Sequence, residues 1–235
     1  MTLKTNARLA GFIFLLYIAT GITSMVVFRK AAGGAEGITA TLASLAQHAS
    51  FVRMNILLTL LQAAYALVLG VTLYALTREQ DRDLAVMALC CRAGEGLIAA
   101  ISPIRSLALL SIATAGAPDA AAQALGGLLL KMGGWTGLLA ATCFAVGSAL
   151  YSYLFLRARS IPVSLAWLGV LASVLLAVAV PLQLAGFLRG PVTSFIWVPM
   201  LVFEVALALW LLIKGVAAQP QAAFKTSPDP NGVLG

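Results

Sequence analysis

The sequence predicts an all-α, polytopic membrane protein, a bundle of six transmembrane helices with short amphipathic helices capping its outer face. Hydrophobic residues make up 61% of the chain and charged residues only 10%, whereas a soluble domain carries about 25% charged residues. Six apolar stretches are long enough to cross a hydrocarbon core of about 30 Å, which takes about 20 helical residues. None of them shows the period-two alternation of membrane strands. A water-soluble globule is excluded, because so few polar residues cannot coat it.

Each predicted span is bounded by charges or helix breakers. Arg29 and Lys30 end the first span, the charged run at residues 77–83 separates the second from the third, and Arg157 with Pro162 separates the fourth from the fifth. Backbone amides have no water partner in lipid, so helices are the economical way to cross it. The six spans cover residues 9–28, 55–76, 84–112, 135–156, 163–187 and 193–213, within one transmembrane domain over residues 1–216.

The first span has a rival interpretation. Lys4 and Arg8 precede an apolar run, which is also the pattern of a secretory signal. This run is too long for a signal and ends in Arg29 and Lys30 without a clear small-residue cleavage site. We therefore expect an uncleaved membrane anchor.

Lys and Arg are unevenly divided between alternate loops. The loops on the side of the termini carry more of them than the loops on the opposite side, which predicts that both termini are cytoplasmic. The net charge of +7 fits this membrane-surface pattern. Nucleic-acid binding is not expected, because the basic residues are scattered and lack interleaved aromatic residues.

Two outer connections and the C-terminal segment complete the predicted organisation. Apolar positions recur at spacings of four and three over residues 38–52, which indicates a surface helix with one apolar face. A second such helix is expected to begin at Pro118 and to run toward the double glycine at Gly133 and Gly134. Residues 217–235 are rich in Pro, Gly, Ser, Asn and Gln, and are expected to form a disordered cytoplasmic tail.

Four charged residues lie inside predicted spans. Arg92, Glu95 and Arg105 belong to the third span and Glu204 to the sixth. A charge at the centre of a membrane helix costs at least about 2.5–3.5 kcal/mol, so these side chains should face the bundle interior and find partners. Arg92 and Glu95 are three residues apart, which places them on one helix face.

The depths of these charges predict a cluster. At 1.5 Å per residue, Arg92 and Glu95 lie about 12 and 16 Å from one end of their span, and Glu204 lies about 13 Å from the corresponding end of its own. We therefore expect Arg92 to bridge Glu95 and Glu204. Arg105, near a kink expected at Pro103, should snorkel outward or line an outer cavity. Gln62 and Tyr65 of the second span and Gln183 of the fifth are the predicted hydrogen-bonding neighbours.

Other kinds of site have little support. Cys90, Cys91 and Cys143 lie in apolar runs and are interpreted as small buried hydrophobes. His48 is the single histidine, so a bis-histidine haem site is excluded and neither a metal nor another cofactor is expected. No nucleophile with a base and no glycine-rich phosphate loop is found, so we expect no catalytic residues and no enzymatic activity.

Four segments carry a family resemblance. They are NARLAGFIFLLYIATGI from Asn6, LGVTLYALTREQDRDLAVMALCCRAGE from Leu69, YLFLRARSIPVSLAWLGVLAS from Tyr153 and FEVALALWLLIKGV from Phe203. The chain resembles, over roughly residues 6–216, the bacterial integral-membrane family catalogued as domain of unknown function 4386. That resemblance implies a multi-pass protein of the bacterial inner membrane, and it implies no established activity. It also implies that Arg92, Glu95 and Glu204 belong to the family's own pattern.

Two classes of function remain open. The first is binding or transport of a small molecule, a lipid or a proton through the cluster of Arg92, Glu95 and Glu204. The second is a structural or regulatory membrane subunit in which the cluster only fixes helix packing, as buried ion pairs can. A packing pair would be satisfied by itself, whereas a binding site would keep unused hydrogen-bond capacity. The lipid bilayer is the one partner that the sequence requires. The sequence does not indicate an oligomeric state.

Overall fold

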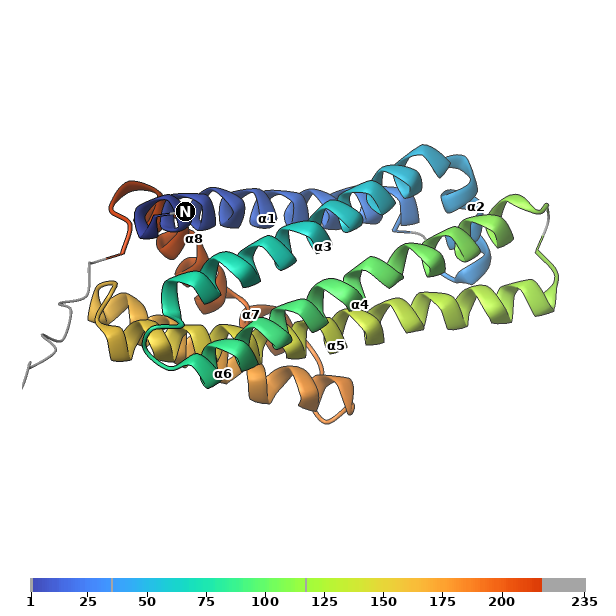
Figure 1. Cartoon of the computed structure of the whole chain (residues 1–235). Helices are drawn as coiled ribbons and strands as arrows, with labels where there is room; N and C mark the ends of the chain where they lie inside the picture. Colours follow the sequence, from blue (N-terminus) through green and yellow to red (C-terminus); the bar gives the residue numbers. More distant parts are fainter. Residues whose placement is uncertain (1, 35, 117, 217–235) are drawn as a thin grey trace, which may run out of the picture.

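The computed structural model confirms the all-α membrane architecture. It describes residues 2–34, 36–116 and 118–216, in which six helices are long and apolar enough to cross a membrane and no strand occurs. The long helices lie side by side as a bundle (Figure 1). They are α1 (Leu3–Ala32), α3 (Ala49–Thr77), α4 (Arg82–Thr114), α5 (Ala120–Ala158), α6 (Val163–Leu184) and the stretch Val192–Ile213, which comprises the short α7 (Val192–Phe195) and α8 (Val198–Ile213). The short helix α2 (Ile38–Gln47) lies between α1 and α3 in the chain.

The long helices pack as a closed ring. Along the chain, α1 packs on α3, α3 on α4, α4 on α5 and α5 on α6; α8 then packs on α6 and on α1, which closes the ring. One apolar cluster built from α1, α3, α4, α5, α6 and α8 fills its interior. The start of α1 and the end of α8 lie at the same end of the bundle (Figure 1), where a Cβ atom on Gly215 would lie 3.8 Å from the Ala7 Cβ, as an even number of spans requires.

Polar side chains and glycines set the helix ends. The Asp81 carboxylate accepts a hydrogen bond from the Leu84 amide at 3.2 Å, and the Asp119 carboxylate accepts one from the Ala122 amide at 2.7 Å. Both satisfy amides that the first turn of a helix leaves without a partner. Gly33 ends α1 with a φ of 75°, in the left-handed conformation that glycine adopts without strain.

One predicted cap is present and the other is wrong. The first predicted surface helix forms as α2, whose Leu42 and Leu45 are buried in a second apolar cluster. This cluster lies at the end of the bundle opposite the start of α1 and the end of α8 (Figure 1), which we call the outer end. After α2 the chain bends at His48 and continues as α3. The second does not exist as a separate helix, because α5 runs without a break through Gly133 and Gly134. A helical glycine costs only about 1 kcal/mol relative to alanine, and packing along α4 and α6 offsets that cost.

One span boundary also differs from prediction. The fifth span was expected to reach residue 187, but α6 ends at Leu184, shortly before Gly186 with a φ of 83°. The sixth span, Val192–Ile213, agrees with the predicted bounds, and within it α7 and α8 are separate helices, with Pro199 in the first turn of α8. The predicted tail, residues 217–235, lies outside the described residues.

The bundle has two tiers because its helices differ in length. At 1.5 Å per residue, the 22 residues of α6 reach about 33 Å, close to the thickness of a hydrocarbon core. The 33 residues of α4 and the 39 of α5 reach about 50 and 60 Å. Beyond the loop that follows α6, the described part of the outer tier consists of α2 and the ends of α1, α3, α4 and α5 (Figure 1).

The ring closes through a close approach of two backbones. A Cβ atom on Gly11 of α1 would lie 2.6 Å from the carbonyl oxygen of Ala208 and 2.7 Å from the amide nitrogen of Leu212, both in α8. Neither backbone atom can move without moving its helix. Glycine at this position therefore sets how closely α1 and α8 pack.

We expect Gly11→Ala to destabilise the protein by about 1–3 kcal/mol, because the added methyl overpacks the interface between α1 and α8. Gly127→Ala is the matched control, since a Cβ there meets nothing within 4 Å. Thermal unfolding in a neutral detergent measures both changes. Equal melting temperatures for the two variants would show that the two helices do not approach as closely as described.

Candidate functional site

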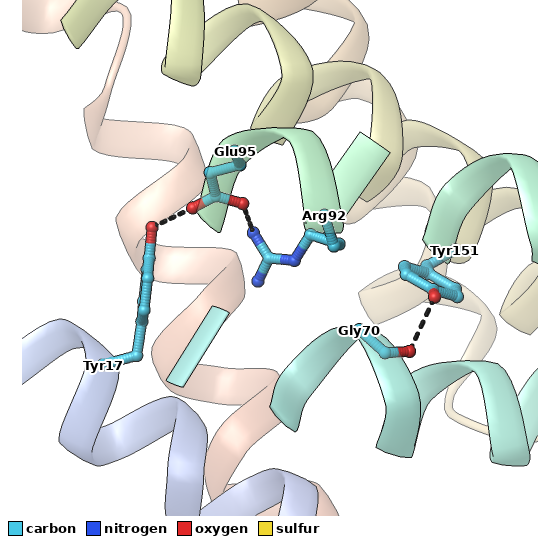
Figure 2. A network of polar contacts seen from close by, with 5 residues as sticks. All are labelled: Tyr17, Gly70, Arg92, Glu95 and Tyr151. Carbon is cyan, nitrogen blue, oxygen red and sulfur yellow. Dashed lines mark hydrogen bonds and ion pairs between the residues drawn. The ribbon is translucent and has the colours of Figure 1, made fainter. Parts of the chain in front are cut away.

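An ion pair lies in the interior of the ring. Nη1 of Arg92 donates a hydrogen bond to Oε2 of Glu95 at 2.7 Å, and the two side chains are only 1% and 6% exposed (Figure 2). Both residues come from α4 and are three positions apart, so one helix face presents them together. The pairing that the sequence predicted between these two residues is therefore present.

A third residue, which the sequence analysis missed, completes this contact. The hydroxyl group of Tyr17, on α1, donates a hydrogen bond to Oε1 of Glu95, the carboxylate oxygen that Arg92 leaves free (Figure 2). A tyrosine within an apolar span was the available signal, because a buried phenol hydroxyl usually finds a hydrogen-bond partner. Tyr17 thus ties α1 to α4 through Glu95.

Aromatic rings surround the guanidinium of Arg92. Its Cζ atom lies 5.0 Å from the ring centroid of Phe144, 5.5 Å from that of Tyr17 and 5.9 Å from that of Phe14. Each ring is close enough for a cation–π interaction, which is strongest where water is excluded. The Nε and Nη2 atoms have no hydrogen-bond partner among the described residues. Rings from α1 and α5 therefore supply much of the environment of this cation.

Two glycines allow α3 and α5 to lie close to α4. A Cβ atom on Gly70 of α3 would lie 3.1 Å from the Arg92 Cβ, and one on Gly147 of α5 would lie 3.0 Å from the Cys91 Cβ and 3.3 Å from the Ala88 carbonyl oxygen. The Tyr151 hydroxyl of α5 also donates a hydrogen bond of 2.9 Å to the Gly70 carbonyl (Figure 2). The three helices α3, α4 and α5 therefore meet closely at the level of the ion pair.

Glu204 does not join the ion pair, and the predicted bridge from Arg92 to Glu204 is wrong. Glu204 is buried in α8, only 7% exposed, yet within the described residues it forms no ion pair. Its Oε1 atom is buried without any hydrogen-bond partner there. The reason lies in the surroundings of Arg92, where Glu95 takes Nη1 and aromatic rings flank the guanidinium.

Glu204 instead lines a cavity of about 510 Å³. Tyr17 and Glu95 line the same cavity, as does Gln62 of α3, one of the predicted neighbours. Their side chains form a polar patch in a lining that is otherwise mostly apolar. The remaining lining residues are Gly21, Ile22, Met25, Thr59, Ala66, Ala99, Ser102, Thr136, Gly137, Ala140, Ala141, Phe144, Trp197, Met200 and Leu201.

The structure does not bring the other predicted residues to this cavity. Tyr65 packs against the edge of the apolar core. Gln183 lies in the last turn of α6 and lines a different cavity at its outer end. Arg105 lies ten residues beyond Glu95 on α4, about 15 Å along the helix, and lines an outer cavity, one of its two expected placements. The sequence overestimated the cluster because depth along a helix does not fix the direction of a side chain.

The two carboxylates of the ring interior differ in their partners. Among the residues that the structure describes, no three His, Cys, Asp or Glu side chains gather in a group that could hold a metal ion. One carboxylate is satisfied by an arginine and a tyrosine, while the other borders a large apolar cavity. The second carboxylate is the group with capacity left for a ligand.

We expect Tyr17→Phe to destabilise the protein by about 1–3 kcal/mol, because Glu95 loses a buried hydrogen-bond donor. Tyr65→Phe is the control: Tyr65 lies at the edge of the core, outside this network, and its change should stay within about 0.5 kcal/mol. Thermal unfolding of the two variants measures the difference. A Tyr17→Phe variant as stable as Tyr65→Phe would rule out the contact with Glu95.

Comparison with known proteins gives one match. The model of a family described as "Domain of unknown function (DUF4386)" matches residues 9–215, which contain all six long helices except the first turns of α1. The search of curated proteins and the search of solved structures found no match. The match includes Tyr17, Arg92, Glu95 and Glu204. The chain therefore belongs to the DUF4386 family, whose resemblance the sequence had indicated.

Proposed function

We propose that this membrane protein binds an amphipathic small molecule or lipid in the cavity beside Glu204, whose carboxylate holds the ligand's polar end. The observation that carries the proposal is the buried Oε1 atom of Glu204, which has no partner among the described residues and belongs to a residue lining a cavity of about 510 Å³. Ligand cavities are commonly about 300–1,000 Å³, largely apolar, with few convergent polar groups.

The charges around the cavity indicate which polar group fits. Arg92 and Glu95 neutralise each other, so Glu204 is left with a formal negative charge of its own. A carboxylate buried in apolar surroundings without a partner is costly. A cationic group, or a neutral hydrogen-bond donor facing a protonated carboxyl group, removes that cost. The ligand we propose therefore carries an amine or a similar donor.

The rim of the cavity indicates where the ligand comes from. Ile22 and Met25 of α1 and Leu201 of α8 line the cavity and are exposed on the outside of the bundle. These are apolar side chains on membrane-spanning helices. An opening with such a rim favours a ligand that arrives from the bilayer with an apolar body of its own.

The alternative, a cluster that only fixes packing, accounts for part of the site. Arg92 and Tyr17 satisfy both carboxylate oxygens of Glu95 and connect two helices, as a packing device should. That role does not account for Glu204, which contributes no hydrogen bond or ion pair to packing within the described residues and occupies a cavity wall. The two interpretations therefore apply to different carboxylates.

The test is the thermal shift caused by dodecylamine, a cationic chain, in a neutral detergent. At a concentration about 100 times its dissociation constant, a ligand stabilises by about 2.7 kcal/mol, or about 5–10 °C for a chain of this size. We expect this shift for the unaltered protein and for the control Glu79→Gln, which changes an exposed glutamate in the loop after α3. We expect Glu204→Gln to abolish the shift without lowering the melting temperature of the protein alone.

Dodecanoate and dodecanol separate charge recognition from chain binding. Dodecanoate should give no shift, because it would place two carboxylates together, and dodecanol should give a smaller one. Equal shifts for dodecylamine and dodecanoate, or a full dodecylamine shift in Glu204→Gln, would contradict the proposal. Unfolding of Glu204→Gln at a much lower temperature would assign Glu204 to packing instead.

A further inference from the structure

We propose that Arg105 binds the phosphate of an anionic membrane lipid in a second cavity, in the outer half of the bundle. This cavity is also about 510 Å³ and is lined by residues of α1, α3, α4 and α5. The inference goes beyond the proposed function, since it concerns a different cavity and a ligand group of the opposite charge. It does not depend on any role of Glu204.

Arg105 is a cation that makes few hydrogen bonds to the rest of the protein. Its Nη1 donates one hydrogen bond of 3.3 Å to the Leu129 carbonyl of α5, and its buried Nε has no partner within the described residues. No carboxylate forms an ion pair with it there. Guanidinium groups bind phosphate through several parallel N–H groups, so Arg105 keeps the donors that an oxyanion needs.

The chain provides a place for this guanidinium. A Cβ atom on Gly133 of α5 would lie 2.6 Å from both Cζ and Nη1 of Arg105. Any other residue at this position would push the guanidinium away from α5. Because residue 133 is a glycine, the guanidinium can lie against α5, where Arg105 lines the cavity.

A polar pair lies on another wall of the cavity. Nδ2 of Asn55 donates hydrogen bonds to the Ser24 carbonyl at 2.9 Å and to the Ser24 Oγ at 2.7 Å. Because Oγ accepts in the second bond, the hydroxyl hydrogen of Ser24 is available to an oxyanion. Arg105 and Ser24 thus supply donors from two helices to one cavity.

The level of the cavity matches that of lipid headgroups. Gly134 of α5 lines this cavity and also the cavity at the outer end of α6, where Gln183 and Leu184 lie. Because α6 is about as long as a hydrocarbon core is thick, its outer end marks the boundary with the headgroups. Lys131 and Arg189 line the neighbouring cavity and add positive charge at this level. Arginine and lysine side chains gathered at this level attract the phosphates of anionic lipids.

The apolar surroundings favour a lipid over a free ion. Met25, Phe28 and Leu130 line the cavity beside Arg105. Gly21, Met25 and Gly137 line both this cavity and the one beside Glu204, so the two are adjacent. A phosphate on Arg105 would leave an acyl chain next to apolar walls that a free ion would not use.

The experiment compares dioleoylphosphatidylglycerol, dioleoylglycerol and inorganic phosphate as additives to the full chain in a neutral detergent. We expect the phospholipid to raise the melting temperature by several degrees, while dioleoylglycerol, which has the same chains without the phosphate, does not. Arg105→Gln should abolish the rise. Arg53→Gln is the matched control, because it removes an exposed arginine of α3 and should keep the rise.

A second variant leaves the charge in place. Gly133→Ala should weaken binding of the phospholipid at least tenfold, because its methyl group displaces the guanidinium, whereas Gly127→Ala should not. If inorganic phosphate raises the melting temperature and the phospholipid does not, and if the rise requires Arg105, the oxyanion site is supported with free phosphate as its occupant. A rise that persists in Arg105→Gln, or no response to either phosphate, would overturn the proposal. Glu204→Gln should leave the phospholipid response unchanged, which separates this test from that of the first cavity.

Discussion

The ion pair between Arg92 and Glu95 is the constraint on which the middle of the bundle depends. An arginine inside a membrane span requires a counter-charge and an environment that replaces water, and four elements of the ring provide these together. Glu95 supplies the charge, aromatic rings of α1 and α5 cover the guanidinium, and Gly70 of α3 and Gly147 of α5 let their helices lie close to α4. Removing Glu95 would leave the buried guanidinium without its counter-charge. The positions of α1, α3, α4 and α5 are therefore coupled at this level.

The same constraint explains why the second carboxylate is left for another purpose. Arg92 forms its ion pair with the glutamate of its own helix, and Tyr17 binds the remaining oxygen of that glutamate. Glu204 comes from α8, the helix that closes the ring, and lies on the wall of a cavity. In the function we propose, packing and binding are thereby divided between two glutamates at similar depth. In the outer tier the charge that lacks a partner is positive: Arg105 lines a second cavity and forms no ion pair with a carboxylate among the described residues.

Much of the fold could be predicted from the sequence, because hydropathy and length decide which segments cross a membrane. The six spans and the pairing of Arg92 with Glu95 follow from composition and from helical spacing. The continuous α5 could not be predicted, since glycines at Gly133 and Gly134 end a helix only when packing does not hold it. Depth arithmetic placed Glu204 at the right level but could not give its direction. Tyr17 was missed because nothing in the sequence around a single tyrosine in an apolar span indicates its hydrogen-bond partner, which lies 78 residues away.

The most direct measurement of this division between the two glutamates is a pair of double-mutant cycles for reversible unfolding in mixed micelles. One cycle combines Arg92→Met with Glu95→Gln, and the other combines Arg92→Met with Glu204→Gln. The account predicts a coupling free energy above about 2 kcal/mol for Arg92 with Glu95 and below about 0.5 kcal/mol for Arg92 with Glu204. A coupling to Glu204 as large as that to Glu95 would contradict it, because both carboxylates would then serve the same ion pair.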